Sequence, residues 1–168
     1  LDQLRQALAE NAPPGVVLAG AAYGNDSGFR EETEQMGLEY VVGIQSSTTV
    51  WKRGQGPLQS SKYSGVGRPP KLLRCSVENQ PVTVKQLALE LPRSAFRSLS
   101  WRPGTKRPLR SRFAAVRIRA ARRDYERHEP RPEQWLLIEW PAKEAQPTKY
   151  WLANLPEETK RKDLVASA

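Results

Sequence analysis

Two carboxylates stand where a metal-dependent phosphoryl-transfer site could use them. Asp26 follows the apolar run Val16–Ala19 after a short loop, and Glu139 lies between Ile138 and Trp140. Carboxylate oxygens are the ligands that hold hard divalent cations during phosphoryl transfer. Each residue also has an ordinary structural interpretation, which we favour. Asn25, Asp26 or Ser27 would cap the helix that follows, and Glu139 would face solvent from a strand.

The single histidine and the single cysteine argue against several kinds of site. His128 lies in a polar turn without a second His or Cys at ligand spacing, so we expect neither a zinc centre nor a histidine-based hydrolytic centre. Cys75 has no partner for an intramolecular disulfide. The glycines between positions 15 and 24 match neither the dinucleotide nor the P-loop signature. We therefore expect no cofactor in this chain.

The basic residues are concentrated in one stretch. The net charge is +9, and 13 of the 27 Lys and Arg residues lie between Arg93 and Arg131. Such clustering favours an anionic partner, with nucleic acid the commonest, over evenly scattered solubilising charge. The candidates for phosphate contacts are Arg102, Lys106, Arg107, Arg110, Arg112, Arg117 and Arg119.

The tryptophans have two interpretations. Trp51 and Trp101 stand beside basic residues and could stack on nucleobases or belong to the core. Trp135, Trp140 and Trp151 lie within apolar strands, so we expect them in the core.

The first 45 residues have the pattern of an α/β sheet. A helix ends near Asn11, the run 16–19 is typical of a buried parallel strand, and a second helix is expected from Ser27 to Met36. Gly37 would cap that helix, and a second buried strand would run from 38 to 44. Loops at the carboxyl ends of such strands are where chemistry is usually placed.

The remainder has a different pattern. Residues 46–80 are rich in Ser, Gly, Pro and Lys, and a helix should begin after Thr83, which forms a capping-box pair with Gln86. From Phe113 the alternation predicts a half-buried strand with Arg117 and Arg119 on its exposed face. Two more strands are expected over 134–140 and 149–155, and a last helix with Glu157 and Glu158 in its first turn.

No apolar run is long enough to cross a membrane, and no signal peptide is recognisable, so we expect a soluble, cytoplasmic chain without membrane contact. Both ends fall within helical patterns, which favours a fragment. A sheet that lacks neighbouring strands exposes an unpaired edge, so self-association is expected.

Three long strings resemble DDE-superfamily insertion-sequence transposases. They are VVLAGAAYGNDSGFREETEQMGLEYVVGIQSSTTVW from position 16, SRFAAVRIRAARRDYERHEPRPEQWLLIEWP from position 111, and PTKYWLANLP from position 147. The resemblance implies an RNase H-like catalytic fold, in which two Asp and one Glu hold two divalent metals, usually Mg²⁺. The metals activate a water or a DNA 3′-hydroxyl for in-line attack at phosphorus.

The chain departs from the family at the position of the second Asp. Related sequences read ADAAYG where this one reads Ala19-Gly20-Ala21-Ala22-Tyr23-Gly24, so Gly20 stands where the carboxylate is expected. In the family the first Asp lies upstream of residue 1, and the Glu lies on a helix downstream of residue 168. Asp26 is not the matched residue.

The resemblance therefore predicts an α/β chain with a partial RNase H-like fold followed by a largely antiparallel β insertion. Residues 1–45 would be the partial core, 46–155 the basic insertion, and 156–168 the start of a helix that returns to the core. The leading hypothesis is a central fragment of a transposase, which binds transposon-end DNA and is inactive alone. The alternatives are a non-catalytic nucleic-acid-binding module derived from a transposase, and a basic structural domain.

Overall fold

The structure is a computed structural model that describes residues 1–13, 15–59, 73–102 and 109–168. For Arg102 and Tyr125 it describes only the backbone. The helices are α1 (Asp2–Ala9), α2 (Ala21–Gly24), α3 (Ser27–Gln35), α4 (Val84–Glu90) and α5 (Arg161–Ala166), with the 3₁₀ turns η1 (Arg93–Ala95) and η2 (Asp124–Glu126). The strands are β1 (Val16–Ala19), β2 (Glu39–Ile44), β3 (Thr49–Lys52), β4 (Val82–Thr83), β5 (Arg97–Arg102), β6 (Leu109–Ala120), β7 (Gln134–Glu139) and β8 (Lys149–Ala153).

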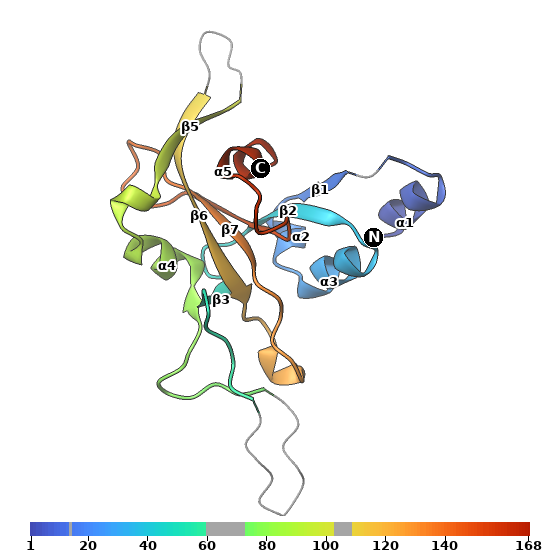
Figure 1. Ribbon diagram of the computed structural model, residues 1–168, viewed down its shortest axis with the longest axis horizontal. Helices are drawn as coiled ribbons and strands as arrows, with labels where there is room; N and C mark the ends of the chain where they lie inside the picture. Colours follow the sequence, from blue (N-terminus) through green and yellow to red (C-terminus); the bar gives the residue numbers. More distant parts are fainter. Residues whose placement is uncertain (14, 60–72, 103–108) are drawn as a thin grey trace, which may run out of the picture.

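All eight strands belong to one mixed sheet, in the order β1-β2-β8-β7-β6-β3-β4, with β5 paired to β6. Only β1 and β2 are parallel; the other pairs are antiparallel. Strand β8 lies beside β2 and joins the N-terminal α/β segment to the β region (Figure 1). The fold is thus a mixed α/β fold, and its sheet is continuous across position 45.

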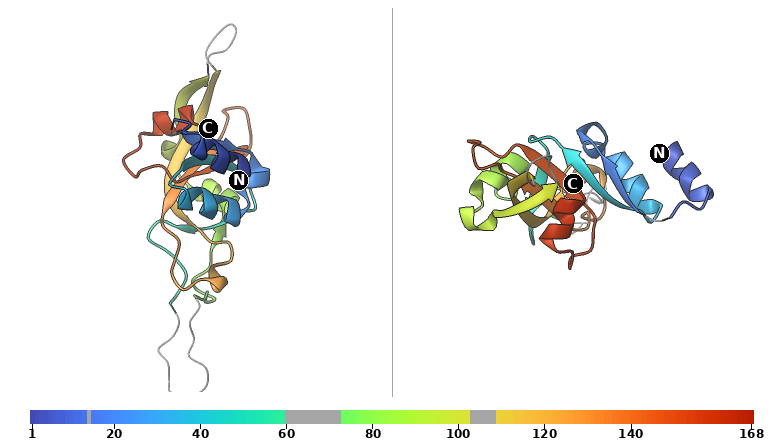
Figure 2. Two further views of the ribbon diagram at one scale, coloured as in Figure 1. Left: turned by 90° about the vertical axis from the view of Figure 1, so that its right-hand side faces the viewer. Right: turned by 90° about the horizontal axis from the view of Figure 1, so that it is seen from above.

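Strand β6 organises the middle of the sheet. One of its edges pairs with β7 from Phe113 to Ile118. Its other edge is shared, because β5 pairs with the N-terminal part and β3 with the C-terminal part. The strand begins at Leu109, four positions before the expected Phe113, and this extension pairs with β5 alone. The β5–β6 pair therefore projects from one end of the sheet, as two views of the molecule show (Figures 1 and 2).

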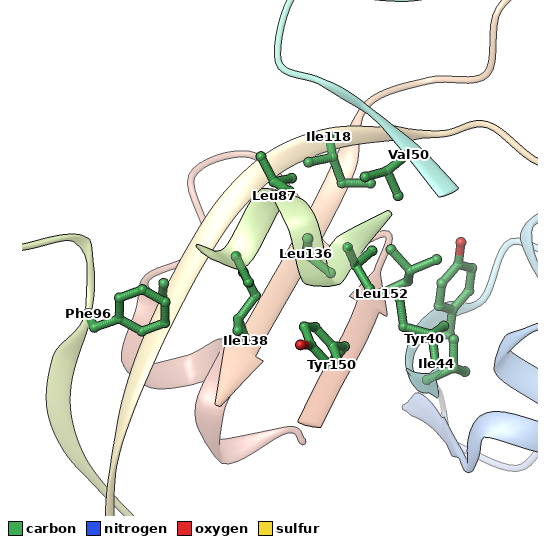
Figure 3. Close-up of a cluster of buried hydrophobic side chains, with 14 of the residues drawn as sticks. Tyr40, Ile44, Val50, Leu87, Phe96, Ile118, Leu136, Ile138, Tyr150 and Leu152 are labelled. Carbon is green, nitrogen blue, oxygen red and sulfur yellow. The ribbon is translucent and has the colours of Figure 1, made fainter. Parts of the chain in front are cut away.

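The main core lies on one face of the sheet. Strand side chains including Leu136, Ile138 and Leu152 are fully buried there together with Leu87 of α4 (Figure 3). Phe29 of α3 belongs to the same cluster. On the opposite face, Leu164 and Val165 of α5 cover a smaller apolar surface. Both faces of the central strands are thus covered, although alternation alone had left one face to solvent.

Local sequence signals place several elements correctly. Thr83 accepts from the Gln86 backbone and Gln86 accepts from the Thr83 backbone, which confirms the predicted capping box of α4. Gly37 follows α3 at φ +73°, a conformation that favours glycine, as predicted for a helix end. The last helix is a correction: α5 begins at Arg161, and Glu157 and Glu158 lie in the preceding turn.

Candidate nucleic-acid interface

Gly20 lies directly after β1, at the carboxyl edge of the two parallel strands. It is the residue before α2 and has φ −77°, which any amino acid can adopt. A Cβ atom placed there would meet nothing within 4 Å. Neither backbone strain nor crowding therefore demands glycine at this position.

Gly24 differs because α2 packs closely against β2. A Cβ on Gly24 would lie 1.9 Å from the carbonyl oxygen of Gly43, so the close approach requires glycine. Asn25 then fixes the loop, because its side-chain oxygen accepts from the Gln45 backbone and from the Thr48 hydroxyl, each at 3.0 Å. The loop after β1 is thereby held over the end of β2.

Asp26 caps α3, so it is the one of the three predicted capping candidates that does so. Its carboxylate accepts from the Gly28 backbone at 2.9 Å. Arg30 of the same helix is buried and donates to the Gly24 carbonyl. Its burial lowers the pKa of the guanidinium group. These contacts make Asp26 and Arg30 parts of the local structure.

The described residues do not fit a two-metal site. No group of three or more His, Cys, Asp or Glu side chains that could hold a metal ion occurs among them. Gly20, at the position where the resemblance implies an Asp, supplies no carboxylate, and one oxygen of the Asp26 carboxylate accepts from the Gly28 backbone. The metal chemistry that the resemblance implies has no donor set in this part of the chain.

Glu139 is a correction to the sequence interpretation, since it is buried rather than exposed (6% exposed). It lies opposite Phe113 of β6 and Lys149 of β8, on the face that α5 covers. The Lys149 ammonium lies 3.5 Å from its carboxylate and supplies a counter-charge. Alternation could not reveal this burial, because the cover comes from a helix that follows β7 in the chain.

The projecting β5–β6 ribbon carries several of the predicted phosphate-contacting residues. Arg110 is exposed and lies directly opposite Ser100; Arg112 lies opposite Ser98. Arg112 is half-buried, donates to the Trp140 carbonyl at 3.2 Å and lies 6.0 Å from the centre of the Trp140 ring. Of the two, Arg110 is the more available to a ligand.

For three other candidates no side chain is described. Lys106 and Arg107 lie outside the described residues, and for Arg102 only the backbone in β5 is described. Their contacts with DNA remain predictions.

Arg117 and Arg119 are half-buried, which corrects the expected exposed face of β6. Arg117 donates to the Glu133 carbonyl at 2.6 Å and lies 5.1 Å from the Trp135 ring centre. Arg119 donates to the Arg131 carbonyl at 2.7 Å. The carbonyls of the segment before β7 have no strand partners among the described residues, so the two guanidinium groups bind them and hold this segment against β6.

Sequence reasoning missed a second basic group, in the turn between β6 and β7. Arg131 is almost fully buried and pairs with Asp124 at 2.9 Å and with Glu31 of α3 at 2.8 Å. Arg127 pairs with the same Glu31 oxygen at 2.9 Å. The basic stretch from Arg93 to Arg131 includes both arginines. Their partner Glu31 on α3 is about 100 positions away in the chain, so the stretch alone did not indicate this pairing.

The burial of the tryptophans differs from the prediction. Trp51 is among the most buried side chains, and its indole donates to Asp124 at 2.6 Å. Trp135, Trp140 and Trp151 are only half-buried and pack at the margins of the apolar clusters. Trp51 therefore belongs to the core and is not available for base stacking.

Comparison with known proteins identifies one family. Residues 1–108 match the sequence model of the DDE superfamily endonucleases. The match includes the β1–α2 loop with Gly20, and β5; the strings from positions 111 and 147 lie outside it. No curated protein matches the chain significantly. Among the described residues, no helix is long and apolar enough to cross a membrane.

Proposed function

Because the chain belongs to the DDE superfamily endonucleases, we propose that it binds DNA during transposition and does not cleave DNA by itself. Family membership implies an RNase H-like fold and a nucleic-acid substrate. Our proposal adds to this family membership that the chain contacts DNA and that it does not cleave DNA by itself.

The observation that carries the binding role is the projecting β5–β6 ribbon. Its N-terminal extension of β6 pairs only with β5 and presents the exposed Arg110. The major groove of DNA is wide enough for a two-stranded ribbon, and arginines reach phosphates or guanine edges from it. A net charge of +9 adds a long-range field that attracts DNA to the chain.

The lack of cleavage rests on Gly20. The family places a metal-binding carboxylate at this position, and a glycine has no side chain to offer. The same observation favours a non-catalytic binding module as the second candidate, because binding does not require the carboxylate.

The binding role is tested by fluorescence anisotropy with a labelled DNA duplex between 50 and 200 mM salt. We expect affinity to fall steeply with salt, because each phosphate contact releases condensed counterions. Arg110→Gln should reduce affinity and lower the salt slope by about one. Lys162→Gln, which removes one exposed charge from α5, is the matched control. Affinity that does not change with salt would contradict the proposal.

The lack of cleavage is tested with supercoiled plasmid and Mg²⁺ or Mn²⁺. We expect no nicking above the background of a mock purification. Nicking that a chelator abolishes, and that is absent from the mock sample, would refute this part of the proposal while leaving the binding role intact.

A further inference from the structure

A second basic site lies at the other end of β6 from the ribbon. A cavity of about 330 Å³ opens between α3 and the turn that follows β6, and four arginines line it. They are Arg122, Arg123, Arg127 and Arg131; the acids at the cavity are Asp26, Glu31 and Glu126. None of these arginines was among the phosphate-contacting residues predicted from charge clustering.

The acids at this cavity are largely engaged already. Asp26 accepts the Gly28 backbone, and Glu31 accepts from both Arg127 and Arg131. Glu126 meets Arg123 only at 4.0 Å, with both side chains more than half exposed, and such a pair contributes little. The four arginines outnumber the three lining acids by one formal charge, and Arg122 and Arg123 are the exposed cations of the cavity. The Gly28 amide is occupied too, so the arginines, and not the helix end, would carry the site.

The backbone conformation of Arg123 is unusual. Its φ is +58° and its ψ +33°, in the left-handed region that disfavours residues with a bulky side chain. Glycine or asparagine would occupy this position with less strain. Strained residues of this kind collect at functional sites, where the side chain is needed despite the backbone cost.

Two further arginines have unused donors. The Nε atom of Arg127 is buried and has no hydrogen-bond partner within the described segments. Arg122 is exposed and uses one of its five N–H groups to reach the Asn25 carbonyl at 2.6 Å. Since the Asn25 side chain is bound to Gln45 and Thr48, this contact places the site beside the loop that carries Gly20.

We propose that the Arg122–Arg123–Arg127 cavity is a phosphate site that holds a phosphodiester of the DNA backbone beside the carboxyl edge of β1 and β2. This inference rests on the proposed DNA-binding role and adds a second contact to the ribbon. Guanidinium groups suit the site because they bind phosphate oxygens through paired, charge-assisted hydrogen bonds.

The test uses two variants of the whole chain. Arg123→Asn removes the charge and tolerates the left-handed conformation, so it should be at least as thermally stable as the original chain. Arg122→Gln/Arg123→Asn removes both exposed charges. We expect the single variant to weaken duplex binding three- to tenfold and to lower the salt slope by about one, and the double variant to lower it by about two. Lys162→Gln is again the control.

The outcomes separate this site from the proposed function. If the original chain binds duplex with a steep salt slope and both variants keep its affinity and slope, the phosphate site is wrong and the ribbon remains. If the original chain does not bind duplex, both proposals fail. If inorganic phosphate raises the melting temperature of the original chain but not of Arg123→Asn, while DNA affinity is equal for both, the cavity takes free phosphate and the DNA assignment is overturned.

Discussion

Gly20 is the residue on which the proposed lack of cleavage rests. The resemblance identified it from the sequence, and the structure shows that the site could accept a larger side chain. No steric constraint therefore requires glycine at position 20, unlike Gly24, whose contact with the Gly43 carbonyl excludes a Cβ.

We expect Gly20→Asp to fold normally and to remain unable to cleave DNA. The position precedes α2, where aspartate is a preferred helix cap, so the change in stability should lie within about 0.5 kcal/mol of zero. Cleavage should stay absent, because one carboxylate does not form a two-metal site. Urea unfolding and the plasmid assay measure the two effects. Metal-dependent nicking by this variant alone would show that other carboxylates of the chain complete the site.

Asp124 has a structural role, and no pattern in the sequence indicated that role. It is buried, pairs with Arg131 at 2.9 Å and accepts from Trp51 at 2.6 Å. The residues it joins come from β3, the turn before β7 and, through Glu31, from α3. In the sequence these are only scattered charges and one tryptophan beside basic residues.

Replacing Asp124 with alanine should destabilise the chain by about 3–5 kcal/mol, because it leaves Arg131 buried with half of its counter-charge and Trp51 without an acceptor. Glu126→Ala, in the same turn but exposed, should change stability by less than about 0.5 kcal/mol. Chemical unfolding of the two variants under identical conditions measures the difference. Equal stabilities would show that the buried network contributes nothing net.

At the scale of elements, local patterns were sufficient for the segments that carry their own signals. Strands β1 and β2, helix α3 with Gly37, and the capped helix α4 agree with the prediction within one or two residues. Strands β3, β4 and β5 were not predicted, since the short β3 and β4 are defined by pairing with distant strands. Strand β5 has only Leu99 and Trp101 as apolar residues, and pairing with β6 makes it a strand.

The site was less predictable than the elements. Charge clustering placed Arg110, which is exposed on the ribbon, in the same candidate group as Arg117 and Arg119, which bind backbone carbonyls. Exposure depends on which carbonyls lie nearby in three dimensions. The cavity beside α3 was missed for the same reason, because its walls come from two distant segments.

The outer edge of β1 predicts self-association. Strand β1 pairs with β2 on one side, and within the described residues its other side has no strand partner. Leu18 of this strand is 63% exposed, and an open edge with an apolar side chain is a template for pairing with a second copy. The sedimentation coefficient should rise with concentration, and Leu18→Lys should suppress this rise.

Leu89→Lys is the matched control for the edge variant, since Leu89 is comparably exposed (48%) but lies on α4, away from β1. If the original chain sediments as a monomer at every concentration, or if both lysine variants act equally, pairing through β1 is wrong.

At the scale of the whole molecule, β6 connects the two proposed DNA contacts. Arg110 pairs with Ser100 of β5 near the start of β6, and Arg122 lies two residues after Ala120, the last residue of β6. At about 3.4 Å per strand residue, the two sites lie roughly 40 Å apart. A duplex rises about 3.4 Å per base pair, so about 12 base pairs are needed to reach both.

Affinity should therefore depend on duplex length in two stages. We expect an 8-base-pair duplex to bind with a salt slope that reflects one site, and a duplex of about 16 base pairs to bind more tightly and with a steeper slope. Arg122→Gln/Arg123→Asn should remove the advantage of the longer duplex, and Arg123→Asn alone should reduce it. If affinity instead rises gradually with duplex length, and does so equally for the original chain and the double variant, the chain has a single site that slides along DNA.

The pairing of β2 with β8 has a consequence for how the chain is made. The Tyr40 backbone donates to the Asn154 side chain across 114 positions, so β2 gains this neighbour only after the long segment between β2 and β8 has been synthesised. At ordinary rates of translation the delay is on the order of ten seconds. During that time the buried side chains of β2 face solvent, and a nascent chain in this state is a natural client for a chaperone at the ribosome. Fast synthesis should therefore favour recovery of soluble protein, whereas stalling between β2 and β8 should promote aggregation.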